Sequence, residues 1–310
     1  MAERRSTHWR PSSRGCAETG FTLVELLVAL MVGTLLMGVA LTITLSTRRG
    51  YAADQGRVRV NQQLRSSLDL VGVQIRQAGE RLPFDFPALE VHDGADGAPD
   101  ELILWRNLLD DVLPLCATLP NGGTGTDVRA AEGAGPPQGC NALPDDDGDG
   151  FPDNIGRWRA FRDSRGGSVW AYVYNPVDRL GEYFLYDDDG TTSNFLHRGD
   201  GGAWAREYDV DQQARIYLLE QRRYGLDGGT LNFELDQGNG DRIHLSSNIT
   251  DFQVRAVLDD GTILDELNSN DDWTALSAIE ITLTADAEVD GRTTTRTVST
   301  RFFPRNVLSN

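Results

Sequence analysis

Hydrophobic residues follow three different patterns along this 310-residue chain. The first is an apolar run over residues 21–45, "FTLVELLVALMVGTLLMGVALTITL", in which Glu25 is the single charged residue. A helix of this run is about 37 Å long, because each residue rises 1.5 Å, and a hydrocarbon core is about 30 Å thick. The run therefore predicts a membrane-spanning helix that carries a carboxylate in its first turns.

The second pattern covers residues 46–82, where apolar residues recur at approximately helical spacing. The stripe consists of Val58, Leu64, Leu68, Val71 and Ile75, and arginine and glutamine occupy the other faces. Such spacing indicates an amphipathic helix that packs on a core through one face. Pro83 is expected to end this helix.

The third pattern consists of short runs of aromatic and branched residues, separated by turn residues, which are typical of strands. The expected strands cover residues 101–107, 169–175, 181–187, 214–225, 231–235, 243–247, 252–258, 278–288 and 296–308. A hairpin turn is expected at 259–261, and the acidic stretches at 186–190 and 236–241 are expected to be hairpin loops. The predicted fold class is α+β, with a long N-terminal helix packed on an antiparallel sheet.

A loop-rich insert is expected at about 108–165, inside a globular β-rich head that covers 83–310.

The distribution of charge marks a further boundary, after the basic residues 1–20. The net charge of the chain is −18, and all 29 of its basic residues are arginine. This acidity argues against nucleic acid as the main partner, because a phosphate backbone requires a basic footprint, and no direct nucleic-acid site is evident. Residues 1–20 are instead basic, which is typical of a flank that stays in the cytoplasm.

Two ordinary interpretations of the apolar run fit poorly. A secretory signal has a shorter apolar region followed by a small-residue cleavage site, whereas the best cleavage site here, between Gly20 and Phe21, precedes the run. A simple membrane anchor rarely places a carboxylate in its first turns, because an intramembrane charge costs about 2.5 kcal/mol or more. Glu25 is therefore expected to have a function, and something must neutralise it.

The segment "GFTLVELLVAL" at 20–30 resembles the class III signal of type IV pilins and type II secretion pseudopilins. The resemblance implies that a prepilin peptidase removes the leader, residues 1–20, and N-methylates Phe21. It also implies that Glu25 is the glutamate that pairs with the N-terminal amine of a neighbouring subunit during assembly. The expected fold is then pilin-like, with a transmembrane and assembly helix at 21–45 and an amphipathic helix at 46–82.

The rest of the chain carries weaker resemblances. The stretch "QIRQAG" at 74–79 and the ending "RTVSTRFFPRNVL" at 296–308 are similar to PilW-like minor pilins, and the first is also similar to pseudopilin J. After leader removal two cysteines remain, Cys116 and Cys140, both in the part expected outside the cytoplasm. Pairing them would close a 25-residue loop, worth about 3 kcal/mol in the chain-entropy model. The alternative is two unpaired thiols, and we expect the disulfide.

An acidic stretch, "DDDGDGFPDN" at 145–154, suggests a cation site. Its oxygen donors fall at the spacing of a calcium loop, and Ca²⁺ takes six to eight oxygen ligands. The expected ligands are Asp145, Asp147, Asp149, Asp153 and the backbone carbonyl of Phe151. The stretch resembles thrombospondin type 3 and dockerin calcium loops, but Gly156 stands where an EF-hand has its bidentate glutamate. The alternative is a solvated acidic turn.

The sequence contains no G-x-S-x-G elbow, Walker loop or H-E-x-x-H motif, so no enzyme is predicted. Three functions remain: a minor pilin of a type IV pilus, a type II secretion pseudopilin, and a membrane-anchored calcium-dependent binding module. The expected partners are other pilins or pseudopilins and the prepilin peptidase/methyltransferase. The expected location is the inner membrane, with a periplasmic head, and then the pilus or pseudopilus.

Overall fold

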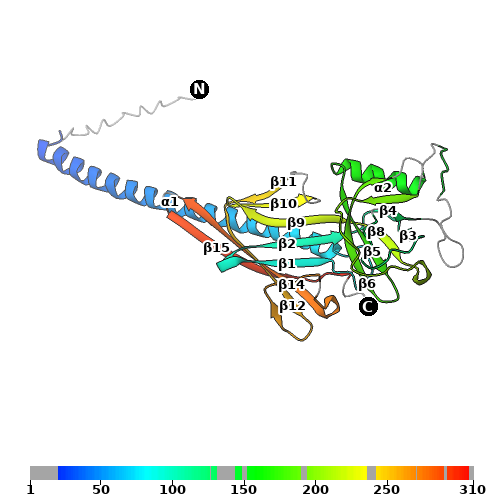
Figure 1. The fold of residues 1–310 in the computed structure, drawn as a ribbon. Coiled ribbons are helices and arrows are strands. Elements are labelled where there is room, and N and C mark those ends of the chain that lie inside the picture. Colours follow the sequence, from blue (N-terminus) through cyan, green and yellow to red (C-terminus); the bar gives the residue numbers. More distant parts are fainter. Residues whose placement is uncertain are drawn as a thin grey trace, which may run out of the picture. The chain divides into compact units, whose positions relative to one another are not determined.

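The computed structural model describes residues 20–125, 127–130, 144–148, 152–189, 194–235, 242–269, 271–289 and 292–306. The chain divides into two compact units, Met1–Asp54 and Gln55–Asn310. Helix α1, Leu23–Gln77, contributes residues to both units (Figure 1). The predicted α+β architecture, a long apolar N-terminal helix and an antiparallel β-rich body, is confirmed.

The part of α1 in the first unit is apolar and exposed. Its most hydrophobic window is long and apolar enough to cross a membrane, and none of that window is buried within the chain. Its threonine hydroxyls donate to carbonyl oxygens one turn back: Thr34 to Met31 at 2.9 Å and Thr42 to Gly38 at 2.8 Å. Because the polar groups of a membrane-spanning segment must find partners inside it, these bonds suit an apolar surrounding.

The part of α1 in the second unit buries one stripe against the sheets. The buried apolar residues of this stripe are Val60, Leu64, Leu68, Val71 and Ile75. Four of these were expected. The assignment of Val58 to the stripe is wrong, because 54% of Val58 is exposed and Val60, four residues before Leu64, takes the buried position.

Helix α1 ends at Gln77, five residues before the expected boundary at 82. Gly79 adopts a φ of +75° and its N–H donates to the carbonyl of Trp105 at 2.8 Å, so the chain leaves the helix and joins the sheet. Arg81 also has a positive φ, of 60°. A glycine in the left-handed conformation is a common helix terminator, and it acts here before Pro83 is reached.

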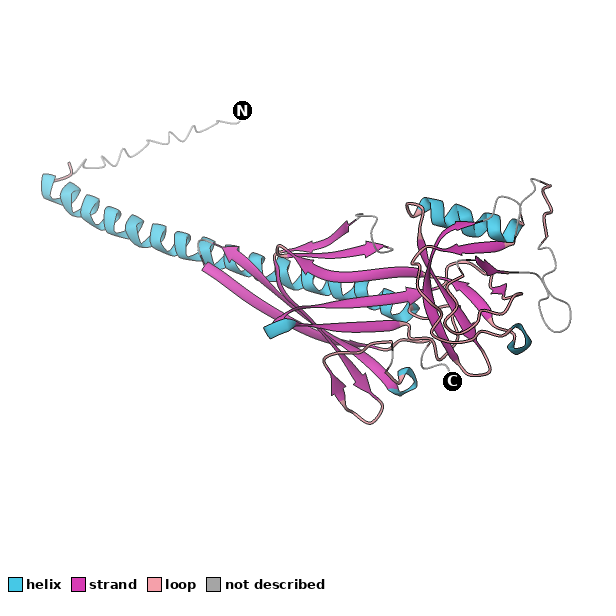
Figure 2. Ribbon diagram, viewed as in Figure 1, coloured by secondary structure: helices cyan, strands magenta, loops and turns pink. Residues whose placement is uncertain are grey.

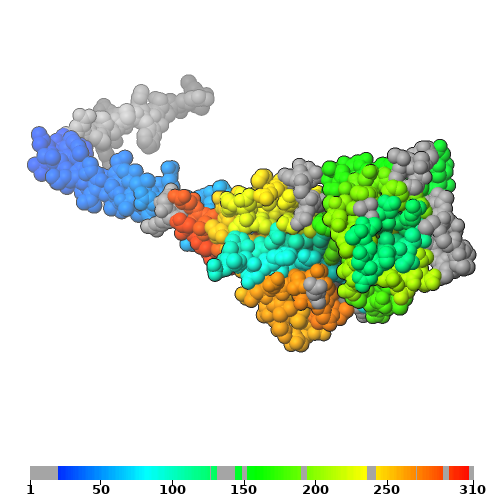
Figure 3. All heavy atoms as spheres, viewed as in Figure 1, coloured from blue at the N-terminus to red at the C-terminus, as the bar shows by residue number. Residues whose placement is uncertain are grey.

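In the described part of the chain, the strands form three antiparallel sheets. The five-stranded sheet has the order β1-β2-β9-β10-β11. Its strands are β1 Leu89–Gly94, β2 Ala98–Arg106, β9 Glu220–Asp227, β10 Thr230–Leu235 and β11 Arg242–Ser247. Figure 3 shows the cyan β1–β2 segment beside the yellow β9–β11 segment, although more than a hundred residues separate them in sequence.

The four-stranded sheet has the order β13-β12-β14-β15. Its strands are β12 Ile249–Leu258, β13 Ile263–Leu264, β14 Leu276–Val289 and β15 Arg292–Phe302. Helix α1 and these two sheets share one hydrophobic core, which includes Leu64, Leu102, Tyr224, Phe252 and Ile281.

The six-stranded sheet has the order β3-β8-β5-β6-β7-β4. Its strands are β3 Leu113–Pro114, β4 Asp127–Arg129, β5 Val169–Asn175, β6 Leu180–Asp189, β7 Phe195–Arg198 and β8 Arg215–Leu218. Helix α2, Asp153–Ser164, packs on this sheet through Ile155 and Trp158 (Figure 2). Within the described residues, short 3₁₀ helices lie at Ala95–Gly97, Val210–Gln212 and Trp273–Ala275. This sheet and α2 enclose a second hydrophobic core.

One predicted strand proves to be two. Residues 214–225 were expected to form a single strand, but the chain passes from β8 in the six-stranded sheet to β9 in the five-stranded sheet. The crossing residue, Leu219, is fully buried and donates its N–H to the carbonyl of Trp170 at 2.9 Å. Leu218 belongs to one core and Leu219 to the other, so the apolar run continues without a turn residue.

The loop-rich insert expected at about 108–165 also contains a helix, α2, which was not predicted. Helix α2 was missed because only Ile155, Trp158 and Arg162 are buried along it, at i, i+3 and i+7. Its apolar stripe is therefore too narrow to stand out in the sequence.

Candidate functional site

The predicted processing site lies at the exposed start of α1. Gly20 and Phe21 precede the first helical residue, and 82% of Phe21 is exposed. Gly20 is exposed, and a side chain added there would meet no atom within 4 Å. A peptide bond in this setting is open to a peptidase. The leader residues 1–19, including Cys16, lie outside the described residues.

Glu25 and Thr22 form a capping box at the start of α1. The hydroxyl of Thr22 donates to Oε2 of Glu25 at 3.3 Å, and the N–H of Glu25 donates to Oγ1 of Thr22 at 3.3 Å. The N–H of Thr22 also reaches Oε2 of Glu25, at 3.5 Å. A Thr-x-x-Glu box satisfies helix N–H groups that have no helical partner, and the helix dipole stabilises a negative charge at this end of the helix. The capping box itself was not predicted, although "TLVE" carries the motif.

The acidic loop brings three of its predicted calcium ligands together. Carboxylate oxygens of Asp145, Asp147 and Asp153 lie within 4.8 Å of one another. Asp145 and Asp147 are exposed, whereas Asp153 is half-buried and is the first residue of α2. The predicted ligands Asp149 and Phe151 lie outside the described residues.

Local turn chemistry sets this arrangement. Gly148 has a φ of +71°, and its N–H donates to Oδ1 of Asp145 at 2.9 Å. The N–H of Asp153 donates to the carbonyl of Pro144 at 2.8 Å, which joins the loop to the first turn of α2. Carboxylates this close repel one another unless a cation or a proton lies between them. The donor set fits Ca²⁺, and calcium binding stays a prediction.

Cys116 is buried and forms a disulfide. Its predicted partner, Cys140, lies outside the described residues, so the pairing stays a prediction. The N–H of Cys116 donates to the carbonyl of Arg129 at 2.9 Å, which ties the start of the insert to β4.

Two buried carboxylates anchor arginines from several elements, and neither was predicted. The side chain of Glu220 is 1% exposed and pairs with Arg106 at 2.7 Å, Arg165 at 2.7 Å and Arg222 at 2.6 Å. Arg106 also donates to Oε1 of Gln77 at 2.9 Å, at the end of α1. This cluster, which we term the Glu220 hub, joins α1, the five-stranded sheet and the segment that follows α2.

The second carboxylate is Asp189, within the stretch expected to be a hairpin loop. That expectation is wrong for residues 186–189, which belong to β6. Asp189 pairs with Arg159 at 2.7 Å and Arg162 at 3.5 Å, and it accepts a hydrogen bond from the Tyr186 hydroxyl at 2.7 Å. Burial, followed by this bond, raises the pKa of Tyr186. The expected hairpin loop at 236–241 lies outside the described residues.

An exposed apolar helix directly after the predicted cleavage site is typical of proteins that are anchored in a membrane by their N-terminal helix. The family model of the prokaryotic N-terminal methylation motif matches residues 16–41, which include Gly20, Phe21, Glu25 and the start of α1. This motif and the fold support a type IV pilin-like protein with a class III signal, of the group that contains pilins and pseudopilins. The group is structural rather than enzymatic. No curated protein and no solved structure gives a significant match to the chain.

Proposed function

We propose that the chain is a minor pilin, built into a type IV pilus, that supports pilus assembly and through it adhesion, twitching or DNA uptake. Its partners are other pilins, which it contacts through α1, and the prepilin peptidase/methyltransferase, which cuts after Gly20 and methylates Phe21. Before assembly the chain resides in the inner membrane with its head in the periplasm. The resemblance of residues 74–79 and 296–308 to PilW-like proteins supports the minor role.

The observation that carries this proposal is the contrast between the two parts of α1. The apolar window of the helix is entirely exposed, whereas the stripe from Val60 to Ile75 is buried in the core of the second unit. Exposed apolar surface costs about 25 cal/mol per Å², so the first part of the helix requires lipid or other helices around it. The processing motif before this helix favours a filament of similar helices as its final surrounding.

Glu25 gives the proposal a sharp test, because its capping role can be separated from its charge. Glutamine at the same position keeps the capping box but carries no charge. In a bundle of apolar helices the Glu25 carboxylate would pair with the N-terminal amine of a neighbour, and each unpaired charge in lipid costs about 2.5 kcal/mol or more.

We therefore expect Glu25→Gln and Glu25→Ala both to be processed, and both to be depleted in sheared pili. The readout is the ratio of mature protein in the pilus fraction to that in the membrane fraction, compared by immunoblot. Wild-type incorporation of Glu25→Gln would show that capping suffices, and the intersubunit charge pair would then be rejected.

A pseudopilin of a type II secretion system is the alternative, because the same N-terminal motif serves both machines. Deletion of the gene distinguishes the two: loss of pili and twitching supports the minor pilin, and loss of exoprotein secretion with normal pili supports the pseudopilin. A membrane-anchored calcium-dependent binding module is a further alternative, favoured by the clustering of Asp145, Asp147 and Asp153. It predicts surface binding that a calcium chelator abolishes even where no pilus is assembled.

A further inference from the structure

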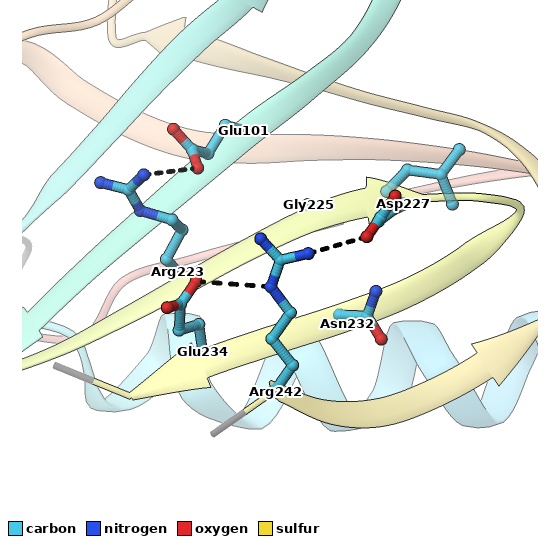
Figure 4. A pocket seen from close by; sticks show the side chains of 8 residues that line it. Glu101, Arg223, Gly225, Asp227, Asn232, Glu234 and Arg242 are labelled. Carbon is cyan, nitrogen blue, oxygen red and sulfur yellow. Dashed lines mark hydrogen bonds and ion pairs between the residues drawn. The ribbon is translucent and has the colours of Figure 1, made fainter. Parts of the chain in front are cut away.

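The outer face of the five-stranded sheet carries a polar pocket of about 160 Å³. Its lining includes Glu101 of β2, Arg223, Gly225 and Asp227 of β9, and Asn232 and Glu234 of β10 (Figure 4). Alternate residues of the same strands, such as Tyr224 and Leu231, belong to the core shared with α1. The pocket therefore opens on the face of the sheet opposite the core, and we term it the β9–β10 pocket.

Gly225 forms the floor of this pocket, and neither conformation nor packing requires a glycine there. Gly225 pairs with Asn232 in regular antiparallel register, its φ is not among the positive values, and an added Cβ would meet no atom within 4 Å. Glycine inside a strand costs about 0.5–1 kcal/mol relative to alanine. Such a glycine often marks a place where a ligand or another backbone approaches closely.

Two polar atoms in the pocket lack hydrogen-bond partners among the described residues. Asn232 is 8% exposed; its Nδ2 donates to the carbonyl of Thr230 at 3.1 Å, but its Oδ1 accepts nothing. The Nε of Arg223 is also buried without a partner, although the Nη1 of the same guanidinium pairs with Glu101 at 3.1 Å. An unpaired buried acceptor and an unpaired buried donor each cost about 1–3 kcal/mol, so a group that supplies both a donor and an acceptor would be bound favourably.

The charges that surround the pocket are largely paired. Arg223 pairs with Glu101, and Arg242 of β11 pairs with Asp227 at 2.7 Å and contacts Glu234 at 3.8 Å (Figure 4). Two guanidiniums against three carboxylates leave one excess negative charge, which repels anions. A cation would have to displace an arginine from its carboxylate. A neutral polar ligand is not repelled and does not have to displace an arginine.

We infer that the β9–β10 pocket binds a neutral polyhydroxylated ligand, a single sugar ring of a glycan. A sugar ring carries several hydroxyl groups, and each is both donor and acceptor, so one hydroxyl can donate to Oδ1 of Asn232 while another accepts from Nε of Arg223. Adjacent hydroxyls donate to the carboxylates of Glu101 and Glu234. This inference goes beyond the proposed function and does not rest on it, because a minor pilin without a glycan site would still assemble through α1.

The test uses the full-length protein in a detergent without a sugar headgroup, so that the detergent does not compete. Saturation-transfer NMR is recorded with glucose, galactose, mannose and N-acetylglucosamine, each at millimolar concentration. We expect saturation transfer from the protein to at least one of these sugars, and we expect neither acetate nor guanidinium to reduce it. Gly225→Val fills the floor with a strand-favouring side chain and should weaken binding at least about tenfold, the change expected from losing about 1.4 kcal/mol. Asn232→Leu removes the acceptor and should do the same.

Gly156→Ala is the matched control, since Gly156 also has open space around an added Cβ but lies on α2, away from the pocket. It should bind as the wild type does. The melting temperature of Gly225→Val should equal or exceed that of the wild type, so this variant tests binding even if Asn232→Leu fails to fold. The absence of transfer to all four sugars, or unchanged transfer to a folded Gly225→Val variant, would overturn the inference. Either result would leave the Glu25 tests of the proposed function intact.

Discussion

Gly72 of α1 lies directly against the ring of Phe302 at the end of β15. A Cβ added to Gly72 would fall 2.1 Å from Cε1 of Phe302, which is closer than any real Cβ contact. Phe302 is itself 4% exposed, and the guanidinium of Arg76 lies 5.8 Å from its ring centroid. This contact sets how closely α1 approaches the four-stranded sheet, and only glycine at position 72 permits it.

Gly72→Ala should therefore lower the free energy of unfolding by about 1–3 kcal/mol, the usual cost of overpacking a core. Chemical denaturation of the full-length protein in detergent measures the loss. Gly156→Ala, a glycine-to-alanine change in an open helix position, should instead stabilise by about 0.4–1 kcal/mol. In the double variant, Phe302→Leu should offset part of the unfolding free energy that Gly72→Ala loses. If the losses of the two single variants simply add in the double variant, the contact between Gly72 and Phe302 is contradicted.

Gly20→Val should block removal of the leader, because the peptidase must fit residue 20 at the cut. Mass spectrometry of the purified protein should then find the full-length precursor with no N-methylated Phe21. Gly38→Val is the control: Gly38 also has open space around it, lies in α1, and should leave processing unchanged. A Gly20→Val protein that matures normally would place the processing site elsewhere.

Calcium should stabilise the protein if Asp145, Asp147 and Asp153 hold the ion. Binding to the folded form alone contributes about 2.7 kcal/mol at a hundredfold excess over Kd, so the melting temperature should rise with calcium relative to chelator. Asp145→Asn combined with Asp147→Asn should abolish most of that rise, whereas Asp211→Asn, which changes an exposed carboxylate in the 3₁₀ helix Val210–Gln212, should not. Magnesium should substitute poorly, because it demands a tighter octahedral shell. Identical melting temperatures with calcium and with chelator would favour the alternative, in which residues 145–154 are a solvated acidic turn.

The buried carboxylate of Asp100 should make the stability of the fold depend on pH in a defined direction. This carboxylate accepts N–H groups from Gly94 at 2.9 Å and Val254 at 2.7 Å, and it joins the β1–β2 hairpin to β12. Burial raises its pKa above the ordinary value of 3.8, and the two N–H groups partly oppose that rise. The folded state therefore binds more protons than the unfolded state above pH 3.8, and ionisation of Asp100 reduces stability as the pH rises through the folded-state pKa.

The difference in unfolding free energy between the wild type and Asp100→Asn should consequently shrink as the pH rises across this window. The variant should be less stable at every pH, because an amide cannot accept both N–H groups and leaves one buried donor unpaired, at about 1–3 kcal/mol. Denaturation curves at several pH values measure both effects. A difference that grows with pH would contradict the sign of the shift.

Much of the architecture could be predicted from local patterns. Residues 169–175 were expected to form a strand and form β5 over the same residues, because alternating aromatic and branched side chains cover both faces of a buried strand. The stripe of α1 was placed correctly at four of its five positions. The N-terminal methylation motif is contiguous in sequence, which explains why it could be recognised there, whereas cleavage after Gly20 and the assembly role of Glu25 stay predictions.

The missed features depend on contacts between distant segments. Leu219 looks like any other residue of an apolar run, and only the pairing of β8 and β9 with different sheets shows that the strand crosses there. Glu220 and Asp189 are two acidic residues among 47, and burial among arginines distinguishes them. The β9–β10 pocket requires the register that places Gly225 opposite Asn232, which no spacing within one segment reveals.

The crossing at Leu219 has a mechanical consequence. The six-stranded sheet is joined to the five-stranded sheet by covalent backbone at the β8–β9 junction, and the Glu220 hub grips the same point from α1 and from the segment after α2. Tension applied to the six-stranded sheet would run along β9, whose long axis lies within a sheet of hydrogen-bonded neighbours, so detachment would require several backbone hydrogen bonds to shear together. Tension on the six-stranded sheet would thus be transmitted to the end of α1 before the six-stranded and five-stranded sheets separate.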